Sequence, residues 1–138
     1  MPCCVNRRHA SVAACAALTL CTLLAATPAG AQMARNFPAT ALRGTLQITQ
    51  PPEALLNGQS ARLAPGARIR DMQNMQHVSG RFAGETLTVN YTLEPGTGLV
   101  KDVWILRADE AAKKPWPTTA AEAAKWTFDP LAQIWTKP

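Results

Sequence analysis

The sequence predicts a mainly β protein: a single small antiparallel barrel or sandwich of five to seven short strands with a short C-terminal helix. Apolar and polar residues alternate with a period of two in several short segments, which is typical of half-buried strands. Turn signals such as Asn57-Gly58 separate these segments at short intervals. The 138-residue chain contains no internal repeat that would indicate a second domain. We expect four parts: a signal peptide over residues 1–31, a flexible lead-in over 32–40, an antiparallel β-domain over 41–108, and a helical or irregular tail over 109–138 that packs on it.

The first part of the chain has the layout of a signal peptide. Arg7 and Arg8 precede an apolar stretch over residues 10–26 that carries no charged side chain, and Ala29-Gly30-Ala31 follows as a cleavage motif. We therefore expect cleavage between Ala31 and Gln32 and export to the periplasm. Loss of the two arginines would reduce the formal net charge from +5 to +3.

The cysteines all precede the expected cleavage site, at Cys3, Cys4, Cys15 and Cys21. The mature chain would then have no disulfide, no thiolate metal site and no cysteine nucleophile. Lipidation at Cys15 or Cys21 is a poorer interpretation, because most of the apolar stretch follows Cys15 and a bulky Leu20 precedes Cys21. No later segment offers the roughly 20 apolar residues that a membrane-spanning helix needs.

Two segments of the β-domain alternate clearly, over residues 42–49 and 86–93. Their expected inward residues are Leu42, Gly44, Leu46 and Ile48 in the first and Leu87, Val89, Tyr91 and Leu93 in the second. We expect Asn90 and the threonines of the second segment to face solvent, as in an antiparallel sheet with one wet face.

The rest of the β-domain is less regular. Residues 54–71 indicate three short strands divided by Asn57-Gly58 and Pro65-Gly66, and residues 77–84 indicate another. The segment around Trp104 is apolar on both faces, so another part of the chain must cover its second face.

The tail contains a candidate for that cover. Thr119-Ala-Ala-Glu122 matches a capping box and predicts a helix from about Ala120 to Trp126. We expect at least one of Trp116, Trp126 and Trp135 to pack against the Trp104 strand.

Positive charge is unevenly distributed: residues 32–84 have a net charge of +4 and residues 85–138 of −1. An anion-binding or partner-binding surface is one interpretation of four arginines: Arg62, Arg68, Arg70 and Arg81. A solvated outer face of a sheet would give the same pattern. The partner would be a protein or an anionic envelope component. Nucleic acid is not expected, because the arginine-bearing strands lack interleaved aromatic residues for base stacking.

The segment Met72-Gln-Asn-Met75-Gln-His77 suggests a different chemistry. Thioether sulfur and imidazole are ligands that suit Cu(I), so Met72, Met75 and His77 form a candidate copper site. The alternative is that the two methionines fill gaps in the core beside a turn. Without this site, no cofactor is expected.

Catalytic groups are scarce. His77 and Ser79 would share one face of a strand and could act as base and nucleophile, with Asp71 or Asp102 orienting the histidine. The plainer interpretation is a turn histidine beside a solvated serine. We therefore expect no catalytic residues.

The segments LLNGQSARLAPGARIRD and GETLTVNYTLEPGTGLVKDVWIL together resemble a group of small uncharacterised exported β-domain proteins of Gram-negative bacteria. The resemblance covers about Arg43 to Glu110. The chain is also loosely similar to small periplasmic barrels of the oligonucleotide/oligosaccharide-binding type. These resemblances imply export and a β-fold and supply no functional motif. The sequence thus favours an exported, non-catalytic binding or envelope-assembly module, with a periplasmic copper-binding protein as the alternative.

Overall fold

The computed structural model describes residues 33–138, which form one compact unit. The expected leader and its cleavage residues Ala29, Ala31 and Gln32 lie outside the described residues. None of the helices formed by residues 33–138 is long and apolar enough to cross a membrane.

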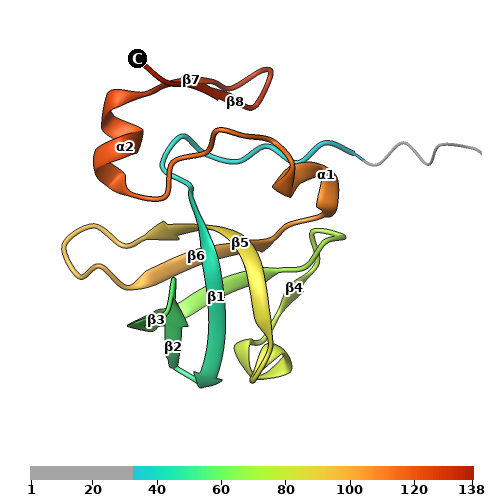
Figure 1. The fold of residues 1–138 in the computed structure, drawn as a ribbon. Helices are drawn as coiled ribbons and strands as arrows, with labels where there is room; N and C mark the ends of the chain where they lie inside the picture. The colour runs from blue at the N-terminus through green and yellow to red at the C-terminus, as the bar shows by residue number, and fades with distance from the viewer. Residues whose placement is uncertain (1–32) are drawn as a thin grey trace, which may run out of the picture. The chain divides into compact units, whose positions relative to one another are not determined.

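The described chain is mainly β (Figure 1). Its main sheet consists of β1 (Leu42–Gln50), β2 (Glu53–Leu56), β3 (Gln59–Arg70), β4 (Gln76–His77), β5 (Thr86–Leu93) and β6 (Val100–Ile105). A 3₁₀ helix, η1 (Ser79–Phe82), follows β4. The tail consists of α1 (Ala108–Ala111), α2 (Ala120–Lys125), β7 (Thr127–Asp129) and β8 (Ile134–Thr136).

The main sheet closes on itself. Its strand order is β2-β1-β5-β6-β3-β4, and β2 also pairs with β3, so that β1, β2, β3, β6 and β5 form a ring. All pairings are antiparallel except the parallel pair β3–β6. The predicted fold class is therefore confirmed, as a sandwich-like closed ring instead of a regular barrel.

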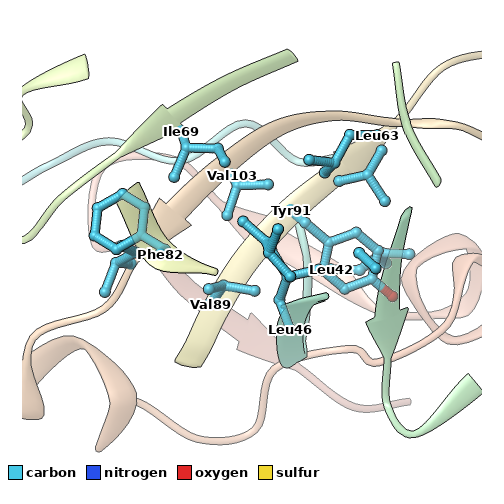
Figure 2. Packing of buried hydrophobic residues seen from close by; sticks show 12 residues of the cluster. Leu42, Leu46, Leu63, Ile69, Phe82, Val89, Tyr91 and Val103 are labelled. Atoms are coloured by element: carbon cyan, nitrogen blue, oxygen red, sulfur yellow. The ribbon is translucent and has the colours of Figure 1, made fainter. Parts of the chain in front are cut away.

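The alternating residues of β1 and β5 fill the interior of the ring. Figure 2 shows Leu42, Leu46, Val89 and Tyr91 pointing toward side chains from β3, β6 and η1. Leu46 and Val89 have no exposed surface. The period-two pattern thus identified the inward face of both strands. Leu93, at the end of β5, is the exception and is exposed.

The chain between Glu53 and Arg70 forms two strands, so the prediction of three short strands is wrong. β3 continues through Pro65-Gly66. The strand tolerates Pro65 because the register between β3 and β6 shifts between Leu63 and Arg68, where a residue without an N–H is accommodated.

The predicted strand over residues 77–84 is also wrong. β4 ends at His77, and residues 79–82 form η1. Val78 and Phe82 would share one face of such a strand, but Val78 is 78% exposed whereas Phe82 is buried. One turn of 3₁₀ helix is enough to carry Phe82 into the core, so a strand is not required.

A second hydrophobic cluster covers the outer face of β6. Phe37, Leu106, Trp116 and Trp135 are buried together, and Trp104 packs against them. The ring centroid of Phe37 lies 5.8 Å from those of both Trp104 and Trp116. Figure 1 shows α2 and the β7–β8 hairpin on the side of the ring where β1 begins. The residues before β1, expected to be flexible, are therefore anchored through Phe37, and Trp116 and Trp135 supply the expected cover.

The second cluster and the tail bury part of the face of β5 that was expected to be exposed to solvent. Asn90 has no exposed surface and Thr92 is 9% exposed, although alternation placed both in solvent. Thr86 and Thr88, nearer the start of the strand, are exposed as expected.

The start of α2 follows its predicted capping motif in part. Thr119 Oγ1 accepts a hydrogen bond from the backbone N–H of Glu122 at 3.2 Å. The Glu122 carboxylate accepts from the backbone and hydroxyl of Thr118 instead of completing the box at Thr119. The β7–β8 hairpin after α2 was not predicted.

Candidate functional site

The methionine–histidine segment lies at the turn between β3 and β4. Met72 and Met75 are 45% and 61% exposed, so they do not fill core gaps. His77 Nε2 lies 2.6 Å from Asp71 Oδ2, and its Nδ1 lies 2.9 Å from Arg81 Nη1. A guanidinium only donates, so Nδ1 accepts from Arg81 and Nε2–H donates to Asp71. A metal at His77 would have to displace one of these two partners.

The same contacts bear on the hydrolase hypothesis. The structure brings Asp71 and His77 together, but the two ring nitrogens of His77 form hydrogen bonds with Asp71 and Arg81 and none with Ser79. Asp71 also accepts from the backbone N–H groups of Gln73 and Met75. Desolvation raises the pKa of Asp71, but these hydrogen bonds outweigh it and hold the pKa below its usual value. The group therefore holds a turn together. Across residues 33–138, no group of three or more His, Cys, Asp or Glu side chains is placed to hold a metal ion.

The four candidate arginines do not form one free surface. Arg62 pairs with Glu53, with 3.4 Å between Nε and Oε1, and Arg81 bonds to His77. Arg68 and Arg70 share Asp102 at 3.3 and 3.7 Å. Each guanidinium thus already has a partner that an added anion would need to displace or share.

A different basic surface lies in the tail, in a hollow of about 610 Å³ that we call the tail groove. Its lining comes from β1, from the connection between α1 and α2, from α2 itself and from residues near the end of the chain: Arg43, Lys114, Pro115, Trp116, Thr118, Glu122, Trp126 and Lys137. Four of these eight side chains are tryptophan or lysine. A volume of this size is within the range of small-molecule sites.

Arg43 has a structural role at the base of the groove. Its guanidinium donates to the backbone carbonyls of Glu110, Ala111 and Lys113, and its Nε donates to Asn90 Oδ1. The Glu110 carbonyl also accepts from the backbone N–H of Lys113, whereas the carbonyls of Ala111 and Lys113 lie at and after the end of α1, where the helix itself supplies no partner. Burial lowers the pKa of Arg43, and the negative charge of Glu110 reverses part of that decrease. With its donors engaged, Arg43 positions the groove wall and is not available to a ligand.

Lys114 and Lys137 are the available cations. Neither forms an ion pair with an acidic residue of the described chain. Lys114 is exposed, and Lys137 Nζ lies 5.0 Å from the ring centroid of the half-buried Trp126, a cation–π distance. This contact places an ammonium group directly beside an indole ring.

Glu122 is the acidic member of the lining. Its Oε2 accepts from Thr118 N at 2.8 Å and from Thr118 Oγ1 at 3.0 Å. The bonds from Thr118 are the main cause of its lowered pKa, and Lys137 contributes a smaller share. Glu122 therefore stays ionised at neutral pH, within a groove that is otherwise basic.

A buried charge network fixes the segments beside the groove. Glu110 accepts from Arg35 Nε at 2.8 Å and from the backbone N–H of Arg107 at 2.9 Å, and Arg35 Nη2 forms a second short contact with it. Arg35 also donates to the carbonyls of Asp71 and Ile105. The network joins the residues before β1 to the end of β6 and to α1, and so holds the start of the tail in place.

The tail groove was missed in the sequence because its residues come from four separate segments. The only local signal was the tryptophan-rich tail, which we interpreted as cover for β6. Trp116 and Trp135 are buried in that cover, and Trp126 packs against it half-buried. Trp116 and Trp126 also line the groove.

Comparison with protein-family models, with curated proteins and with solved structures yields no match for this chain.

Proposed function

We propose that the protein is an exported, non-catalytic binding module that holds an acidic ligand in the tail groove. The observation that carries this proposal is the pair Lys114 and Lys137, two cations without acidic partners that line one hollow together with Trp126. Fixed positive charge beside an aromatic wall attracts anions and retains them better than an open surface does.

Export is the part of the proposal that comes from the sequence. The arginines and apolar stretch of residues 1–31 favour passage into the periplasm, where anionic components of the cell envelope are abundant. The earlier interpretation of the β3 arginines as the anion surface is less well supported, because Arg68 and Arg70 share Asp102.

Isothermal titration of the expressed protein with a tetraglutamate peptide tests the proposal. We expect binding that weakens as salt is added, because the interacting charges are exposed. Replacing both lysines, Lys114→Gln with Lys137→Gln, is expected to weaken binding about tenfold, since two exposed charge contacts contribute up to about 1 kcal/mol each.

A matched control removes the same charge elsewhere. Lys101→Gln with Arg68→Gln lowers the net charge equally but changes only β6 and β3. We expect this control to bind within about twofold of the wild type. Equal weakening in both double variants would contradict the proposal, because it would show that net charge alone determines binding.

A further inference from the structure

Glu122 is unexpected in a groove that attracts anions. A purely anionic ligand would be repelled by its carboxylate, which the hydrogen bonds from Thr118 keep in place. Its second oxygen, Oε1, accepts no hydrogen bond from residues 33–138. The lining of the groove therefore contains one strong acceptor without a hydrogen-bond donor, together with the two lysines.

A ligand that satisfies this lining must carry three kinds of group. It needs an anion for Lys114 and Lys137, hydrogen-bond donors for Glu122 Oε1, and an apolar face for the exposed part of the Trp126 ring. A sugar acid has all three, because its carboxylate, its hydroxyl groups and the C–H face of its ring point in different directions. An acidic peptide has the anion and amide N–H donors but no apolar ring face.

We propose that the tail groove recognises an acidic sugar, a uronate unit within an oligosaccharide. This inference rests on the proposed function and names its ligand class. The carboxylate of the sugar pairs with the lysines and its hydroxyls donate to Glu122. Its ring lies against Trp126, in the place that the Lys137 ammonium takes over that ring in the free protein.

An adjoining hollow supports an oligomer over a single sugar. This second hollow has a volume of about 220 Å³ and shares Lys114 and Pro115 with the tail groove. Its lining also contains the exposed Lys113, and on its other side Gln133 and Ile134. A chain of acidic sugars that extends past Lys114 would thus meet another ammonium group.

The test compares three soluble probes on the expressed protein by isothermal titration: trigalacturonate, triglutamate with an acetylated N-terminus, and the uncharged galactose trimer. We expect trigalacturonate to bind at least about tenfold more tightly than either of the others, since only it combines an anion for the lysines, hydroxyl donors for Glu122 and a ring face for Trp126. Trp126→Ala is expected to weaken trigalacturonate about tenfold and triglutamate about twofold or less. Trp126→Phe keeps an aromatic face and should recover part of the loss.

Glu122→Gln gives the sharpest result, because the two anionic probes should respond in opposite directions. The glutamine retains an oxygen for Thr118 but is a weaker acceptor for hydroxyls, so trigalacturonate should bind several-fold more weakly. The same change removes repulsion, so triglutamate should bind more tightly. Circular dichroism of each variant checks that the fold is retained.

Two outcomes separate this inference from the proposed function. If both anionic probes bind equally and Glu122→Gln strengthens both, the groove is a general anion site, and the assignment to a sugar acid is overturned while the proposed function stands. If neither anionic probe binds at low salt, the proposed function fails and the sugar assignment fails with it.

Discussion

The stability of the domain is expected to depend strongly on one buried carboxylate, Glu110. Its side chain is 4% exposed and lies between the guanidinium groups of Arg35 and Arg107. The substitution Glu110→Gln removes the negative charge that pairs with the buried Arg35 guanidinium. Loss of one partner from a buried ion pair costs about 3–5 kcal/mol. Glutamine keeps one acceptor oxygen and Arg35 keeps two backbone carbonyls, so the lower end applies, about 3 kcal/mol.

Thermal unfolding followed by circular dichroism measures this effect. In a domain of about 100 residues, each kcal/mol lowers Tm by about 4–8 °C, so Glu110→Gln is expected to lower Tm by about 12 °C or more. The matched control is Asp109→Asn, which removes a 61% exposed carboxylate that also contacts Arg107. We expect the control to change Tm far less. A Glu110→Gln variant that unfolds within about 3 °C of the wild type would refute the reasoning.

The pH dependence of the same variant provides a second check. Burial raises the pKa of Glu110, but the hydrogen bonds and charges of Arg35 and Arg107 outweigh it and leave the pKa below the ordinary value of 4.5. A carboxyl group with a lowered folded-state pKa stabilises the fold above its unfolded pKa and loses that contribution as the pH falls through the folded value. The stability difference between wild type and variant should therefore be full at neutral pH and shrink as the pH falls below about 4.5. A constant difference down to about pH 3 would contradict this assignment.

Two further substitutions test the packing of the two clusters, each by chemical denaturation. Gly44→Ala would place a Cβ 2.6 Å from Asn57 Oδ1 and is expected to lower the free energy of unfolding by about 1–3 kcal/mol. Its control is Gly80→Ala, whose added Cβ meets nothing within 4 Å and should change the free energy of unfolding by less than about 0.5 kcal/mol. Equal costs would show that the close approach at Gly44 is not limiting. Phe37→Ala is expected to cost about 3 kcal/mol because that ring is 5% exposed, and Met33→Ala should cost almost nothing because its side chain is 88% exposed. A Phe37→Ala variant as stable as Met33→Ala would mean that the residues before β1 do not help to hold the second cluster.

Local patterns in the sequence were sufficient where one local rule holds. The inward residues of β1, and those of β5 as far as Tyr91, follow the alternation. The Asn57-Gly58 turn lies between β2 and β3 as expected, with positive φ at both residues. The N-cap at Thr119 was also recognisable, because capping depends on residues only three positions apart.

The remaining features depend on contacts between distant segments. Asn90 looks like a solvent-facing residue until Arg43 and the tail cover it, and Val78 looks like a core residue until the chain turns into η1. The tail groove combines β1 with three parts of the tail, so no local window contains it. The arginines of β3 show the opposite effect: they are conspicuous in the sequence, but Arg62 pairs with Glu53, and Arg68 and Arg70 share Asp102.

A ¹H–¹⁵N NMR titration of the protein with trigalacturonate tests most directly where an anion binds. We expect the largest shifts at the indole N–H of Trp126 and at the backbone N–H groups of Lys114 and Thr118, all in the tail groove. Shifts concentrated instead at Arg68 and Arg70 on β3, or no shifts at low salt, would contradict the assignment of the tail groove as the binding site.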